Sequence, residues 1–258
     1  MKIISLGADC FPKVMLVKYG YVKRRRDGGK SFPFDLARHY SDQIISIIDN
    51  DFEGYLDADE LFVNDNKVIQ NRRYGCYFSH ESCDNRLEQF TTDNFEPFIC
   101  RYSNRLLNFR AALEGTNEVV FVMRYWKGLS VNLPKLEDSI HLRYPRLEFK
   151  ILCIHTPPPG DEPEDTESGR WVHKCIPLPW EGYVFWKDLD LSFERRVCLF
   201  LSEHLPVVSP EVLGGFDEEQ LPIPRTWGLS DWLTWGKTMA WRWMKRKFFK
   251  VFIYKYIQ

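Results

Sequence analysis

The chain alternates between short apolar runs and stretches in which apolar residues recur at helical spacing. Residues 2–6 form an apolar run closed by Gly7, and helix-like spacing follows over residues 11–19. This order predicts a strand, a tight turn and a helix. Beyond them the pattern predicts an amphipathic helix over 36–48, short strands and turns over 56–80, and a helix over 94–113.

The middle of the chain contains the clearest regular unit. Residues 118–124 and 147–154 are apolar runs of the kind found in buried strands. Residues 134–144, between them, begin with proline and have the pattern of a helix. A strand, a helix and a strand of this size predict a βαβ unit with parallel strands. We therefore expect an α/β fold with an open, mostly parallel sheet and flanking helices.

The last third of the chain changes composition several times. Residues 156–169 hold five acidic residues and four prolines, which predicts a flexible surface insertion. A helix is predicted over 193–205. The predicted domains are an α/β domain over 1–205, a Pro/Gly-rich connection over 206–225, and a basic, Trp-rich amphipathic tail over 226–258.

The overall charge balance hides two opposite parts. The 258 residues are 44% hydrophobic and 28% charged, as in a folded globular protein, and the net charge of -1 argues against a nucleic-acid partner. Residues 226–258, however, carry seven basic residues against one acid, a net charge of +6, and the remainder carries -7. The tail thus needs a separate interpretation.

The tail combines its positive charge with five of the nine tryptophans. Such a helix is suited to the interface of an anionic membrane, with Trp rings at the headgroup level. A Trp stripe is also typical of a helix packed on its own domain or on a second copy in a homo-oligomer. The sequence leaves both alternatives open.

Cysteine usage and the chain start bear on the compartment. Seven widely spaced cysteines, an odd number, predict reduced thiols, and the start lacks the apolar region of a signal peptide. No run approaches the roughly 18 apolar residues that span a membrane. We expect a cytoplasmic protein, free or peripheral on the inner face of the membrane. We expect no cofactor and no metal, since Cys76, His80 and Cys83 match no common zinc spacing.

Cys10 is the first candidate for chemistry, because it follows the predicted turn and directly precedes a helix with Pro12 in its first turn. A helix N-terminus favours a thiolate, so we expect a lowered pKa for Cys10. Free backbone N–H groups near residues 10–12 would stabilise an oxyanion. The alternative is a small buried residue at a tight corner.

A nucleophilic cysteine needs a base, which is usually a histidine brought close by folding. His80 ends a strand-like run and is followed by the acids Glu81 and Asp84, which would orient it. His155 closes a predicted strand, where ligands bind in open α/β sheets. His39 falls within a predicted helix, so we expect it to face solvent. These patterns rank His80 only slightly above His155.

Strand ends supply candidates for substrate binding. Arg124 ends a predicted buried strand, where it either pairs with a core acid or holds an anionic group. Asp9, Asp35 and His155 would join Arg124 in holding a phosphate-bearing or sugar substrate if Cys10 is only structural.

Five short blocks of sequence form a further signal. They are Ile-Ser-Leu-Gly-Ala-Asp-Cys at 4–10, Ser-Phe-Pro-Phe-Asp at 31–35, Tyr-Gly-Cys-Tyr-Phe-Ser-His at 74–80, Val-Val-Phe-Val-Met-Arg at 119–124 and Trp-Glu-Gly-Tyr-Val-Phe-Trp at 180–186. Together they resemble a bacterial family of unknown function that is labelled as papain-like cysteine peptidases. The resemblance covers roughly residues 2–200. It implies that Cys10 is the nucleophile, His80 the base and Asp35 the orienting acid.

The resemblance also bears on fold and function. It implies a papain-like α+β fold as the less favoured alternative to the open parallel sheet. The leading hypothesis is a cysteine-dependent acyl-transfer enzyme, a peptidase, other hydrolase or transferase, acting on a small-molecule, peptide or glycan substrate. The alternative is a transferase or binding protein of glycan or cell-envelope biosynthesis that acts at the membrane surface.

Overall fold

The computed structural model of the chain describes residues 1–206, apart from 83–85, 116–117, 127–130, 162, 186–187 and 189. Met1–Val207 form one compact unit. The predicted connection, apart from Pro206, and the predicted basic tail lie outside the described residues, so their roles stay predictions. None of the helices in the described part combines the length and the hydropathy needed to cross a bilayer.

Sixteen short and long elements follow one another in the described residues. They are β1 (Lys2–Ser5), α1 (Phe11–Lys18), η1 (Arg25–Asp27), α2 (Ser41–Asp49), η2 (Ala58–Glu60), β2 (Leu61–Val63), β3 (Ile69–Asn71), β4 (Tyr77–Phe78), α3 (Ser79–Ser82), α4 (Leu87–Glu114), β5 (Glu118–Trp126), α5 (Leu133–Arg143), β6 (Glu148–Thr156), β7 (Thr166–Glu167), β8 (Trp171–Cys175) and α6 (Leu191–His204).

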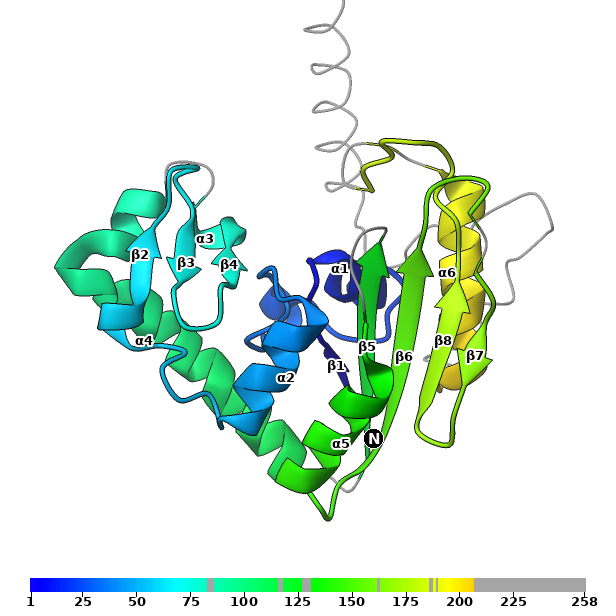
Figure 1. The fold of residues 1–258 in the computed structure, drawn as a ribbon, viewed down its shortest axis with the longest axis horizontal. Helices are drawn as coiled ribbons and strands as arrows, with labels where there is room; N and C mark the ends of the chain where they lie inside the picture. Colours follow the sequence, from blue (N-terminus) through cyan, green and yellow to red (C-terminus); the bar gives the residue numbers. More distant parts are fainter. Residues whose placement is uncertain are drawn as a thin grey trace, which may run out of the picture. The chain divides into compact units, whose positions relative to one another are not determined.

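A five-stranded sheet in the order β1-β5-β6-β8-β7 organises the fold (Figure 1). Within this sheet β1, β5, β6 and β8 are parallel, and β7 runs antiparallel at the edge. The predicted βαβ unit is β5–α5–β6, whose strands pair from Glu118 with Glu148 to Trp126 with Thr156. The expected α/β class is confirmed. The mostly parallel sheet agrees with the favoured open-sheet prediction over the papain-like α+β alternative.

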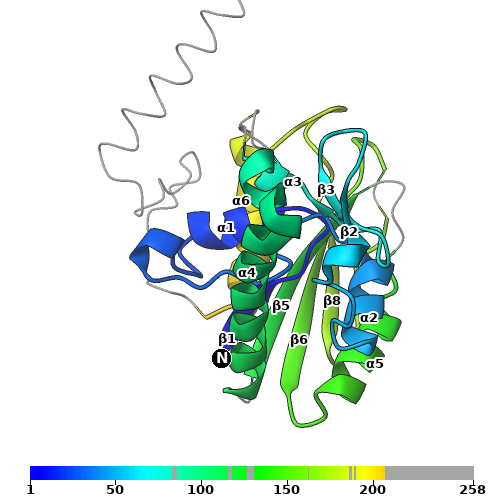
Figure 2. The ribbon, with the colours of Figure 1, turned by 90° about the vertical axis from the view of Figure 1, so that its left-hand side faces the viewer.

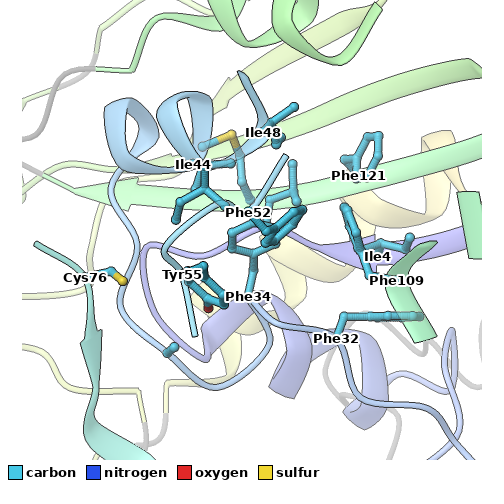
Figure 3. Close-up of a cluster of buried hydrophobic side chains, with 14 of the residues drawn as sticks. Ile4, Phe32, Phe34, Ile44, Ile48, Phe52, Tyr55, Cys76, Phe109 and Phe121 are labelled. Carbon is cyan, nitrogen blue, oxygen red and sulfur yellow. The ribbon is translucent and has the colours of Figure 1, made fainter. Parts of the chain in front are cut away.

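Helices cover both faces of this sheet. Figure 2 shows α1 and α6 on one side and α2 and α5 on the other. Burial on both faces explains why β5 and β6 read as continuous apolar runs. One large hydrophobic cluster fills the space between the sheet, α2 and α4, and includes Phe34, Phe52, Phe109 and Phe121 (Figure 3). The parallel strands are therefore packed against helices on both faces.

A small antiparallel sheet of β2, β3 and β4 carries α3 and the candidate base His80. Glu81 of α3 is buried and accepts hydrogen bonds from Arg105 at 2.9 Å and from Tyr102 at 3.1 Å. Each bond ends on a different carboxylate oxygen of Glu81. Glu81 therefore anchors α3 to α4, which differs from the predicted role of orienting His80.

Candidate functional site

The turn after β1 depends on Gly7. Its φ is +37°, in the region that favours glycine, and a Cβ at this position would lie 2.7 Å from the carbonyl oxygen of His39. Gly7 thus allows the chain to pass close to the segment before α2. This close passage leads the chain from the carboxyl end of β1 to Asp9 and Cys10.

Asp35 is fully buried and joins three parts of the fold. Its Oδ1 accepts a hydrogen bond from Ser5 Oγ of β1 at 2.5 Å, and its Oδ2 accepts one from the Phe32 N–H at 2.9 Å. Lys13 of α1 forms an ion pair with Oδ2 at 2.9 Å. These contacts connect the sequence blocks at 4–10 and 31–35. They describe a scaffold role for Asp35, whereas its predicted role as an orienting acid stays a prediction.

Asp9 and Arg124 form a largely buried ion pair at the carboxyl edge of the sheet. Arg124 Nη1 donates to Asp9 Oδ2 at 3.0 Å, and Nε donates to Thr156 Oγ1 at 2.9 Å. The guanidinium carbon lies 4.5 Å from the centre of the Phe11 ring. Burial raises the pKa of Asp9 and lowers the pKa of Arg124, and the attraction between the two charges opposes both shifts. Arg124 thus does pair with an acid.

A pocket of about 220 Å³ opens next to this ion pair. Its lining residues are Asp9, Arg38, Arg124, Trp126, Thr156, Pro158, Leu178, Tyr183, Val184 and Phe185. They come from the segments that follow β1, from the ends of β5 and β6, and from the loop after β8. Ligands of α/β proteins bind at this carboxyl edge of parallel strands. The pocket is therefore the candidate functional site.

Cys10 follows Asp9 directly and occupies the N-cap position of α1. Burial raises the pKa of its thiol to about 11, and the charge of Asp9 adds to the shift. The expected lowering of this pKa is wrong, because burial outweighs the dipole of an eight-residue helix and the side chain makes no capping hydrogen bond. Cys10 is half-buried and is not among the pocket-lining residues.

The start of α1 also offers fewer oxyanion donors than expected. The Phe11 N–H already donates to Asp9 Oδ1 at 2.9 Å, and Pro12 has no N–H. Of the three amides near residues 10–12, the N–H of Cys10 therefore remains as a donor for an oxyanion.

His80 lies in the first turn of α3 and is half-buried. Two backbone hydrogen bonds, of 2.7 Å and 3.1 Å, join Arg38 of the pocket to Tyr77 of β4. Because His80 follows Tyr77 by three residues, the candidate base belongs to a segment that is anchored to the pocket wall. Its pairing with Cys10 stays a prediction.

His155 lies at the same edge of the sheet but on the opposite face from Arg124. It pairs in register with Tyr125, one position beyond Arg124, and successive residues of a strand point to opposite faces. Its ring stacks on Tyr125 with centroids 4.2 Å apart, and His173 lies beyond at 5.7 Å. Burial and then His173 lower the pKa of His155 to about 4. The prediction that His155 joins Asp9 and Arg124 in one site is therefore wrong, because His155 and Arg124 lie on opposite faces of the sheet.

Sequence reasoning missed or misplaced several residues of this region. His39 precedes α2, is fully buried and lies 2.9 Å from the Tyr55 hydroxyl, so the expected solvent-facing position is wrong. Burial lowers its pKa to about 3. Arg38 carried no local signal. Tyr183 and Phe185 belong to the sequence block at 180–186, which was the signal that pointed toward them.

These features define an α/β protein with a pocket, the candidate ligand site, at the carboxyl edge of its parallel strands. A family model described as "Putative papain-like cysteine peptidase (DUF1796)" matches residues 1–157, and the chain belongs to this family. The match includes Asp9, Cys10, Arg38 and Arg124 and ends before the loop after β8. No curated protein and no solved structure matched the chain.

Proposed function

We propose that the protein is a cysteine-dependent acyl-transfer enzyme, a hydrolase or transferase, with Cys10 as its nucleophile. Membership of the family and the position of Cys10 at the start of α1 support this proposal. The observation that carries it is the ion pair between Asp9 and Arg124. This pair fixes the residue before Cys10 in the wall of a pocket at the carboxyl edge of the sheet.

A thiol pKa of about 11 means that Cys10 enters the reaction protonated. A base must therefore take the Sγ proton while Sγ attacks the substrate carbonyl, as a general base does for a hydroxyl nucleophile. His80 is the candidate base, because its segment is anchored to the pocket wall through Arg38 and Tyr77.

The proposed reaction then has two stages. The Sγ–C bond forms, the carbonyl oxygen becomes an oxyanion next to the N–H of Cys10, and the bond to the leaving group breaks as that group takes the proton from His80. Water or another acceptor next attacks the thioester carbon and gives up its own proton to His80. The Sγ–C bond breaks, and the proton returns to Sγ.

A second candidate function is favoured by the burial of Cys10 and its absence from the pocket lining. In this alternative the protein is a transferase or binding protein of glycan or cell-envelope biosynthesis, and Cys10 is structural. The pocket would hold a phosphate-bearing or sugar substrate, and the basic tail would contact an anionic membrane surface.

An ester assay separates the two candidates. We would offer the full chain mono-p-nitrophenyl glutarate, whose acyl group is anionic, and neutral p-nitrophenyl butyrate, and measure p-nitrophenolate release and the intact mass. We expect an acyl adduct on Cys10 and a loss of at least about 100-fold in release for Cys10→Ala. Cys198→Ala is the matched control, since burial raises the pKa of the Cys198 thiol to about 11 as well.

The same assay can also contradict the proposed function. Turnover that survives Cys10→Ala, or a chain that never carries an acyl adduct, would contradict acyl transfer by Cys10 and favour the second candidate. His80→Ala tests the base separately, and we expect it to lower the rate of adduct formation without preventing ester binding.

A further inference from the structure

We infer that the pocket binds a small ligand with an oxyanion group, a carboxylate or a phosphate, on a flat apolar body, and that Arg38 and Arg124 bind the oxyanion. This inference deepens the proposed function by naming the substrate class. The binding site consists of pocket residues other than Cys10, so ligand binding can be measured independently of the acyl-transfer chemistry.

Arg124 presents one unused donor nitrogen to the pocket. Its Nη1 and Nε are bonded to Asp9 and Thr156. Its Nη2 has no hydrogen-bond partner among the described residues. This nitrogen is also absent from the set of fully buried side-chain atoms that lack a partner, so it is accessible to solvent. Because Arg124 lines the pocket, Nη2 is open to a ligand there. Its two other bonds hold the guanidinium in place, so little side-chain entropy is lost on binding.

Arg38 adds a second cation, which pairs with no acid among the described residues. Its backbone is fixed by the paired hydrogen bonds to Tyr77, and its exposed side chain forms no ion pair within the described part of the chain. Its charge lowers the pKa of both Asp9 and Cys10 against the larger effect of burial, so the guanidinium lies near both. Since Asp9 already neutralises Arg124, Arg38 gives the described lining of the pocket an excess positive charge.

The remaining walls are largely apolar and define the body of the ligand. Trp126, Leu178 and Phe185 are among them. The volume of about 220 Å³ exceeds the roughly 150 Å³ of a cavity that holds benzene but falls below the roughly 300 Å³ of an ordinary drug-sized site. One ring with an oxyanion group fits this volume.

Asp9 acts here as a positioning residue. Both of its carboxylate oxygens are already bonded, Oδ1 to the Phe11 N–H and Oδ2 to Arg124. It therefore orients the Arg124 guanidinium, and each of its oxygens already accepts one hydrogen bond. This arrangement favours an anionic ligand over a cationic one.

Isothermal titration calorimetry on the full chain tests the inference with phenyl phosphate, phenylacetate, benzyl alcohol and inorganic phosphate as probes. We expect one or both anionic ring compounds to bind at least about 10-fold more tightly than benzyl alcohol and inorganic phosphate. Arg38→Gln should weaken that binding about 10-fold. Arg146→Gln, which removes the same charge from an exposed arginine just before β6, should change it less than about 2-fold.

The outcomes divide cleanly. Equal binding of benzyl alcohol, absence of binding by both anionic ring compounds, or full binding by Arg38→Gln would each overturn the inference. If inorganic phosphate binds as tightly as the anionic ring compounds, the part of the inference that assigns a flat apolar body to the ligand is wrong. Repeating the titration with Cys10→Ala separates the two proposals. If Cys10→Ala still binds the anion and ester turnover does not depend on Cys10, the acyl-transfer mechanism is refuted. The inference of an oxyanion site is then still supported.

Discussion

Asp35 and Asp9 are two acids paired with cations near the start of α1, yet their surroundings differ. Asp35 is fully buried, and Ser5, Phe32 and Lys13 together satisfy both of its oxygens. Asp9 is 15% exposed, lines a pocket, and has a partner, Arg124, with one nitrogen that bonds none of the described residues. The first acid holds the scaffold together, and the second shapes a surface that can receive a ligand.

This difference separates two roles within one sequence block. Ser5 and Gly7 of the first block serve the scaffold, through the bond to Asp35 and the close passage against His39. Asp9, two residues after Gly7, belongs to the pocket. A motif that appears as a single signal along the chain thus contains two kinds of residue. Some stabilise the scaffold, and others line the pocket.

The largest expected effect is on the scaffold side. Asp35→Ala should lower the free energy of unfolding by about 3–5 kcal/mol, because it removes one partner of an ion pair and leaves the buried Ser5 hydroxyl and Phe32 N–H unbonded. Urea unfolding followed by circular dichroism measures the change. Asp65→Ala, at an exposed loop position, is the control and should change stability by less than about 0.5 kcal/mol. A loss below about 1 kcal/mol for Asp35→Ala would contradict the scaffold role.

An intermediate effect is expected from pH, again mainly on the scaffold side. His39 has a pKa lowered to about 3 by complete burial, so as the pH falls below the ordinary value of 6.5 the unfolded chain takes up the proton first. Stability should therefore be full above pH 6.5, and this group should lower it by about 2–3 kcal/mol between pH 6.5 and 4.5.

Urea unfolding at a series of pH values in wild type and His39→Gln measures this contribution. His155→Gln is the comparison, because the pKa of His155 is lowered only to about 4, so its contribution should stop growing at a higher pH than that of His39. A pH dependence that is unchanged in His39→Gln would show that His39 does not titrate as its burial requires.

The smallest expected effect is local to the pocket. The charge of Asp9 is one of the causes that raise the pKa of Cys10, so Asp9→Asn should lower that pKa and increase alkylation of Cys10 by iodoacetamide at pH 9 about twofold to fivefold. Peptide mass spectrometry reads the rate at Cys10. Asp65→Asn should leave the rate unchanged, and equal rates for Asp9→Asn and wild type would show that Asp9 does not act on the thiol.

The βαβ unit was predictable because its signal is local. β5 and β6 are buried on both faces, so their residues form unbroken apolar runs, and Pro134 lies in the first turn of α5. The start of α2 was predicted five residues too early, at 36 instead of Ser41. The preceding segment is held by the Asp35–Ser5 bond and the Arg38–Tyr77 bonds, which join residues far apart in the chain and leave no periodic pattern.

The candidate site was predictable only in part. Asp9 and Arg124 were predicted from their positions at strand ends, since the carboxyl ends of parallel strands meet at one edge. The prediction of a lowered pKa for Cys10 was wrong, because the sequence indicates the start of the helix but not the burial of the thiol, which raises the pKa. Arg38 was missed because its place in the pocket follows from a bridge to Tyr77, 39 positions further along the chain.

The sequence by itself determined the α/β class, the parallel βαβ unit and the placement of Asp9, Cys10 and Arg124 near the carboxyl ends of strands. Hydrophobic periodicity and strand direction are sufficient for those conclusions. Only the tertiary structure decided that Asp35 is a scaffold acid, that His155 faces away from Arg124, and that Arg38 completes the pocket. Burial and long-range pairing set those roles, and neither is a property of a residue's neighbours along the chain.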